Sequence, residues 1–172
     1  LKIFGECMDN YIIREMKKED WESIKEIYNQ ALLEGKSTFN KDLPTYQEWD
    51  KNHLQDCRYV VERNESIIAW CSLAATSSRE VYRGVVEVSI YVNQQYRGKG
   101  VGKKLLTHLC IESEKKGYWT LYSGILANNI ESRKLHLNCG FREIGYREKI
   151  AKDIFGEWQD TVIYEKRSKI IF

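Results

Sequence analysis

Residues 85–104 read VVEVSIYVNQQYRGKGVGKK, and the rest of the chain can be placed around this stretch. Its first eight residues alternate between two faces, which is the period of a β-strand. One face is wholly apolar, whereas the other carries a carboxylate, Glu87. Three glycines follow, and from Val101 onward apolar residues recur at helical spacing. The stretch therefore predicts a strand, a glycine loop and a helix in that order, with the apolar strand face formed by Val86, Val88, Ile90 and Val92.

Glycines at the start of a helix let the backbone approach a ligand closely. The first N–H groups of a helix have no partner within it, and together with the helix dipole they favour an anion, typically a phosphate. Residues 97–102 are thus a candidate phosphate site. Glu87 lies on the strand that leads into this loop, so a phosphate anchor and a candidate base belong to one continuous element.

Two common phosphate motifs do not fit the glycines. A Walker A loop would need a glycine where Arg97 stands and a hydroxyl where Lys104 stands. A dinucleotide fingerprint needs Gly-x-Gly-x-x-Gly near the start of a βαβ unit, whereas this chain has Gly-x-Gly-x-Gly at its middle. A third pattern, Gln/Arg-x-x-Gly-x-Gly/Ala, is present between Gln95 and Gly100.

This third pattern resembles the pyrophosphate loop of the GNAT superfamily of N-acetyltransferases. A second motif follows at the distance found in that superfamily: Asn129-Ile-Glu-Ser132, then His136, then Gly140-Phe141. Asn129 and Gly140 would also serve as plain helix caps, and the two interpretations are compatible. Over positions 11–166 the chain resembles the phosphinothricin and methionine sulfoximine acetyltransferase group. The resemblance is carried by Glu87, His136 and residues 37–40, 79–82 and 155–160.

The resemblance implies an α+β GNAT fold, with a mixed, mostly antiparallel central sheet and helices on both faces. It implies acetyl-CoA as co-substrate and transfer of the acetyl group to the free amine of a small amino-acid-like acceptor, by direct attack in a ternary complex. Backbone groups would do most of the binding. The implied cofactor contacts are Ile90, Tyr91, Val92, Arg97, Gly98, Lys99, Gly100, Val101, Gly102, Lys103, Asn129 and Ser132.

The catalytic groups expected from the resemblance are Glu87 and His136. Glu87 would take a proton from the amine, and partial burial would raise its pKa toward the useful range; the alternative is a solvated strand glutamate. Many GNAT members have a tyrosine acid where this chain has His136. His136 would either protonate the leaving thiolate or be a histidine of the cofactor side. Phe39, Arg79 and Tyr82 are the expected contacts of the acceptor.

Bulk composition limits the other functional classes. The 172 residues are 42% hydrophobic and 30% charged with a net charge of +2, so no broad basic face for nucleic acid is indicated. The five cysteines form no Cys-x-x-Cys pair and the three histidines are scattered, so neither a metal site nor a thiol nucleophile is expected. Reduced thiols favour a cytoplasmic location.

We expect one domain over residues 11–167 and a tail over 168–172. Residues 1–10 are read as a leader or an added segment, with Met8 a possible natural start. No apolar run reaches the ~18 residues of a membrane span. Within the domain, the patterns predict a helix from Trp21 to Gly35 with Asp20 as its N-cap, and a capping box at Thr45. They also predict a hairpin at Asn64-Glu65 and last strands over 141–147 and 161–165. Relatives are usually dimers, so a homodimer is expected.

Two alternatives stay open on the sequence alone. The first is a GNAT enzyme for another amine, such as a protein N-terminus, a polyamine or an aminoglycoside. A polyamine site should have clustered acidic residues in the acceptor loops, which residues 36–43 and 77–84 do not show. The second is an acyl-CoA-binding module without catalysis, against which the presence of Glu87 argues.

Overall fold

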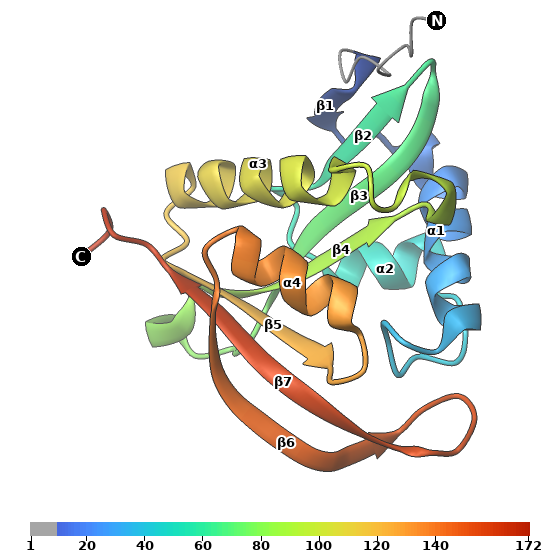
Figure 1. Ribbon diagram of the computed structural model, residues 1–172. Coiled ribbons are helices and arrows are strands. Elements are labelled where there is room, and N and C mark those ends of the chain that lie inside the picture. Colours follow the sequence, from blue (N-terminus) through green and yellow to red (C-terminus); the bar gives the residue numbers. More distant parts are fainter. Residues whose placement is uncertain (1–9) are drawn as a thin grey trace, which may run out of the picture.

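A seven-stranded sheet of order β1-β2-β3-β4-β5-β7-β6 forms the centre of the computed structural model, which describes residues 10–172 (Figure 1). Only β4 and β5 run parallel; every other neighbouring pair is antiparallel. The predicted mixed, mostly antiparallel sheet is therefore confirmed. The strands are β1 (Ile12–Glu15), β2 (Tyr59–Arg63), β3 (Ser66–Ala75), β4 (Val85–Val92), β5 (Thr120–Leu126), β6 (Arg142–Lys152) and β7 (Trp158–Arg167).

Four α-helices cover the two faces of this sheet in the described part of the chain. They are α1 (Trp21–Glu34), α2 (Tyr46–Asn52), α3 (Val101–Lys115) and α4 (Ile130–Asn138). On one face α3 packs into a core with residues of β2 to β5, whereas α1 and α2 form a second core on the other face (Figure 1). Helices on both faces were predicted, and this is confirmed.

The local signals for helix ends hold with one exception. Gly35 closes α1 in the left-handed region with φ 66°, and Thr45 and Glu48 form the expected capping box of α2. Asp20 occupies the predicted N-cap position of α1, but its side chain makes no capping hydrogen bond. Its carboxylate instead accepts hydrogen bonds from the Arg14 guanidinium at 2.8 and 2.9 Å and from the backbone N–H of Lys17.

The last two strands are longer than the sequence pattern indicated. We expected strands over 141–147 and 161–165, but β6 and β7 extend beyond the sheet as a two-stranded ribbon. Their outer residues are largely exposed, so apolar alternation does not mark them. The pairing shifts register between Arg147 and Ala151, where Lys149 has φ 46°.

The parallel pair at the centre of the sheet is short, and this creates the space for a site. β4 pairs with β5 only from Val85 to Glu87. Beyond Glu87 the two strands separate, and the β5-facing backbone groups of the second half of β4 lie outside the ladder. This half of β4 is paired with β3 alone, and the glycine loop and α3 follow it in the chain. The sheet is thus split from Glu87 onward.

Gly84 holds the start of β4 against β5. A Cβ atom at this position would lie 2.0 Å from the Trp119 ring. We expect Gly84→Ala to lower the free energy of unfolding by about 1–3 kcal/mol, because the ring must move out of a packed position. Gly145→Ala is the matched control, since its nearest contact would be at 4.0 Å. Urea unfolding of both variants gives the comparison, and equal loss in both would contradict the assignment.

Candidate active site

A cavity of about 1380 Å³ opens where β4 and β5 separate. Its walls come from the end of α1, the loop over residues 36–43, the second half of β4, the glycine loop, β5 and the first turns of α4. The glycine loop and Glu87 lie toward opposite ends of β4, and both line this cavity, as does Phe39. One continuous space thus contains predicted cofactor residues, the candidate base and one predicted acceptor residue.

The glycine loop has the backbone conformation that an anion site needs. Gly98 and Gly100 adopt φ of 71° and 81°, in the left-handed region that side chains disfavour. Gly100 is the N-cap of α3, and no side chain caps the first N–H groups of this helix. A Cβ atom at Gly102 would lie 3.3 Å from the Leu135 side chain, so glycine lets α3 approach α4. The free N–H groups at the start of α3 suit a phosphate.

Of the other residues predicted to contact the cofactor, most line the cavity and two do not. Ile90, Tyr91 and Val92 line the cavity along the unpaired part of β4, as do Lys103, Asn129 and Ser132. Two predicted residues do not line it: Val101 is buried in the core, and the Lys99 ammonium lies 5.7 Å from the centre of the Tyr96 ring.

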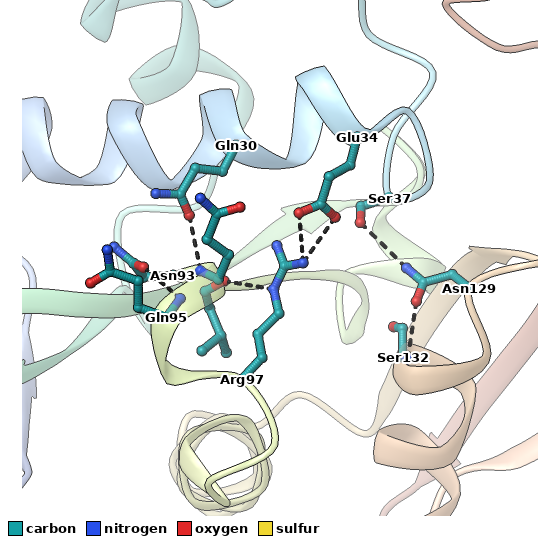
Figure 2. A network of polar contacts seen from close by, with 10 residues as sticks. Gln30, Glu34, Ser37, Asn93, Gln95, Arg97, Asn129 and Ser132 are labelled. Carbon is teal, nitrogen blue, oxygen red and sulfur yellow. Dashed lines mark hydrogen bonds and ion pairs between the residues drawn. The ribbon is translucent and has the colours of Figure 1, made fainter.

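Asn129 connects α4 to the acceptor loop. Its Oδ1 accepts a hydrogen bond from the Ser132 N–H at 3.1 Å, which confirms the N-cap interpretation. Its Nδ2 donates to Ser37 Oγ at 3.3 Å (Figure 2). The residue expected to contact the cofactor arm therefore also fixes the start of the loop over residues 36–43.

The side chain of Arg97 points away from the helix that its loop begins. Its Nη1 donates to both carboxylate oxygens of Glu34 at 2.7 and 2.8 Å, and its Nε donates to the Val92 carbonyl at 3.2 Å (Figure 2). Both charged side chains are about one-third exposed. Arg97 was predicted to contribute to the diphosphate site; its guanidinium is engaged by α1 and by the end of β4.

Glu87 lies where the two strands separate and reaches the cavity. Its side chain has access to the water of this open space, yet the surrounding protein atoms withdraw enough solvent to raise the pKa of the carboxyl above its ordinary value. Tyr91, on the same face of β4, also has a pKa raised by burial. A carboxylate with a raised pKa is suited to accept a proton near neutral pH.

His136 is almost completely buried at the α4 wall, with 2% of its surface exposed. Its Nδ1 lies 2.8 Å from the Ser132 carbonyl, which can only accept, so Nδ1 carries the proton. Burial lowers the pKa of the ring, which favours the neutral form. In this tautomer Nε2 is an acceptor. To act as the predicted acid, His136 would need a second proton on Nε2, and burial of the ring disfavours that charged form.

Unpartnered polar atoms concentrate at the cavity. In the described part of the chain, five buried side-chain atoms lack a hydrogen-bond partner. Four belong to residues that line the cavity: Trp49 Nε1, Trp70 Nε1, Ser123 Oγ and His136 Nε2. Buried polar groups are normally satisfied, so this distribution indicates a space that polar ligand atoms or water complete.

Comparison with known proteins agrees with this geometry. The model of the acetyltransferase (GNAT) family matches residues 21–141. The chain belongs to the GNAT family of acetyltransferases. Its predicted fold and enzyme class are thereby confirmed.

Similar GNAT proteins have closely matching lengths. An L-methionine sulfoximine/L-methionine sulfone acetyltransferase of Salmonella typhimurium is 31% identical, over 89% of this chain and 92% of its own. A phosphinothricin N-acetyltransferase of Streptomyces coelicolor is 28% identical, over 90% and 94%. The structure of a phosphinothricin acetyltransferase from Sinorhizobium meliloti with acetyl-CoA superposes with a TM-score of 0.83 at 25% identity, over 95% and 96%.

The three acceptor residues predicted for this GNAT chain are not brought together. Phe39 lines the cavity, but Arg79 and Tyr82 do not. They flank and end the exposed 3₁₀ turn before β4, where the Arg79 guanidinium lies 5.4 Å from the centre of the Tyr82 ring. Within one chain, these residues form no clamp around an acceptor with Phe39.

Sequence reasoning missed several residues of the GNAT cavity. Tyr28, Trp49 and Trp70 form its aromatic side, and their spacing alone reads as ordinary core. Glu34 and Ser37 were missed because their partners, Arg97 and Asn129, are 63 and 92 residues away in sequence.

Other classes of site find no support in the described residues. Within residues 10–172 there is no group of three or more side chains that could hold a metal ion. No helix in this range is long and apolar enough to cross a membrane. Cys57, Cys71, Cys110 and Cys139 are buried and free, and burial raises the pKa of the first three thiols, which disfavours a reactive thiolate. Cys7 and Met8 lie outside the described residues.

The raised pKa of Glu87 has a consequence for stability. A carboxyl with a higher pKa folded than unfolded contributes stability at low pH that is lost as the pH rises through the folded value. At pH 7 the ionised Glu87 therefore costs folding free energy, and Glu87→Gln should raise the melting temperature. The gain should shrink toward pH 4. Exposed Glu148→Gln is the control; a lower melting temperature for Glu87→Gln at pH 7 would contradict the raised pKa.

Proposed function

We propose that this enzyme transfers the acetyl group of acetyl-CoA to the free α-amine of a small amino-acid-like acceptor of the phosphinothricin, methionine sulfoximine or methionine sulfone type. One observation carries the proposal: a single cavity joins the glycine loop to Glu87. The proposal is supported by relatives named for these acceptors over most of both chains. Both substrates would occupy the cavity together.

The cofactor would lie along the unpaired half of β4. Beyond Glu87 this strand has no β5 partner, so its β5-facing backbone groups around Ile90, Tyr91 and Val92 would pair with an extended arm, as a neighbouring strand would. The Val92 carbonyl already accepts a hydrogen bond from Arg97. The N–H groups of residues 97–102 would hold the diphosphate, with Lys103 adding charge at the cavity wall. Asn129 and Ser132 would contact the arm near its thiol end. When bound, acetyl-CoA supplies an acyl thioester with a good leaving group.

Glu87 would act as the general base. A free aliphatic amine is mostly protonated at neutral pH, since its pKa is near ~10, and only the neutral nitrogen can attack. Glu87 lies at the point where the cavity meets the paired part of the sheet. It would reach the amine of an acceptor held there, either directly or through one water. Its raised pKa brings its basicity closer to that of the working pH. The proton that it takes is available for the leaving thiolate.

His136 would act as a neutral acceptor in the resting enzyme. Its Nε2 lone pair is buried, unpartnered and on the cavity wall, so it would receive a hydrogen bond from the bound cofactor or from water. Transfer would be direct, because the described cysteines are buried and no activated nucleophile borders the cavity.

The free thiols support a cytoplasmic location. The exposed apolar side chains of the β6–β7 ribbon, including Ile144, Tyr146 and Ile150, support a homodimer. Light scattering would then give twice the 20.3 kDa of one chain; a monomer at micromolar concentration would contradict this assembly.

Acceptor choice is tested with a thiol-release assay on purified enzyme. We expect L-methionine sulfoximine, methionine sulfone and phosphinothricin to give higher kcat/KM than a peptide N-terminus, spermidine or an aminoglycoside. We expect this order because we assign a small amino-acid-like acceptor to the cavity. Turnover of the peptide alone would refute the assignment of the acceptor. Cofactor binding without turnover of any amine would favour the non-catalytic alternative.

The base is tested with Glu87→Gln at saturating substrates. Loss of a general base should lower kcat by about 10²- to 10⁴-fold while CoA binding, measured by calorimetry, stays near the wild-type value. In the wild type, kcat/KM should fall at acidic pH with a midpoint above the ordinary glutamate value of about 4.3, because only the ionised carboxylate accepts a proton. Wild-type turnover by the variant would exclude Glu87 as the base.

A further inference from the structure

Four hydrogen bonds join the end of α1 and the residues just after it to the walls of the proposed cofactor groove (Figure 2). Gln30 Oε1 accepts from the backbone N–H of Gln94 at 3.0 Å. Glu34 binds Arg97 of the glycine loop, and Ser37 binds Asn129 at the start of α4. Residues 34–37, which we call the bridge, therefore connect one wall of the groove to the other.

The bridge is held in place by more than its polar contacts. Gly35 is buried, and a Cβ atom there would lie 2.8 Å from Phe155 and 3.0 Å from Ile154, both at the tip of the β6–β7 hairpin. The Ser37–Asn129 bond adds a second attachment. Loss of the Glu34 charge alone should thus leave the bridge where it is, because an ion pair that is about one-third exposed contributes little to folding.

The charge of Glu34 is unexpected at this place. Glu34 lines the same cavity as Gly98 and Gly100, whose loop offers N–H groups to a polyanion. A carboxylate close to a diphosphate opposes its binding through charge repulsion. Glu34 also occupies Arg97, the cation directly before Gly98, and turns its guanidinium toward α1. Both effects reduce the positive potential that the diphosphate meets.

We propose that Glu34 is a positioning residue that, by holding Arg97, limits the affinity of the site for the diphosphate of acetyl-CoA and CoA. The inference rests on the cofactor site proposed above. Without the Glu34 charge, Arg97 is free to turn toward the diphosphate as a charge-assisted donor. The functional consequence is that the product CoA leaves the groove more readily, since substrate and product carry the same diphosphate.

The test is calorimetric titration of the full chain with CoA. We expect Glu34→Gln to lower the Kd by about five- to tenfold, the effect of uncovering one positive charge at a partly exposed site for a diphosphate. Glu26→Gln is the matched control, because it removes the same charge from an exposed position of the same helix, and its Kd should stay within about twofold. A gain of affinity is something that a merely damaged structure would not produce.

Fragments of the cofactor locate the effect. ADP carries a diphosphate, so its binding should tighten in Glu34→Gln, whereas pantetheine, which has none, should bind the variant and the wild type equally. Arg97→Gln provides a second route: it leaves Glu34 without its partner, so the Kd for CoA should rise, and adding Glu34→Gln should reverse most of that rise.

An unchanged or higher Kd for CoA in Glu34→Gln would overturn the proposal, and so would an equal gain with pantetheine. If the wild type itself bound no CoA, the cofactor site and with it the proposed function would be wrong. If the wild type bound CoA and Glu34→Gln left the Kd unchanged, the inference about Glu34 would be wrong, while the proposed function would stand.

Discussion

The separation of β4 from β5 after Glu87 is the constraint on which the rest of the structure depends. A parallel pair in the middle of a sheet would normally continue, because unpaired backbone groups are costly unless a ligand or water satisfies them. Here the pairing stops after three residues, and the chain turns through a glycine loop into α3. The same separation provides a strand edge for an extended ligand, places Glu87 at its inner end and brings the start of α3 to its outer end.

Elements distant in sequence then complete the walls. The end of α1 and the loop after it cover one side, and α4 covers the other, with Glu34–Arg97 and Ser37–Asn129 as the connections (Figure 2). Because Phe39 belongs to the same short segment as Ser37, the acceptor end and the cofactor end share structural support. The loop over residues 36–43 and the start of α4 are therefore structurally connected.

Features that depend on local chemistry could be predicted from the sequence. The strand, glycine loop and helix of residues 85–104, the caps at Gly35 and Thr45, and the hairpin at Asn64-Glu65 all follow from short-range rules, and the structure contains them. The sequence pattern also predicted that Glu87 and the glycine loop belong to one continuous element, and both line one cavity. These features require only neighbours in sequence or a single period of apolar residues.

What could not be predicted depends on long-range pairing. Asp20 lies at the start of α1 as expected, but its carboxylate accepts two charge-assisted hydrogen bonds from Arg14 in place of capping the helix. The pairing of the Arg97 side chain with Glu34 could not be predicted, because Glu34 lies 63 residues earlier and no local pattern indicates the pair; the predicted role of the Arg97 backbone N–H is unaffected. The unpartnered Trp49 and Trp70 atoms are invisible in a sequence where both residues read as core.

The contact between Phe155 and Gly35 gives the outer hairpin a role beyond its own strands. Since a Cβ atom at Gly35 would lie within 3.0 Å of Phe155 and Ile154, the hairpin tip packs closely against the end of α1, where Glu34 lines the cavity. A side chain at position 35 would therefore have to displace the hairpin tip or the end of α1, and with it part of the cavity wall.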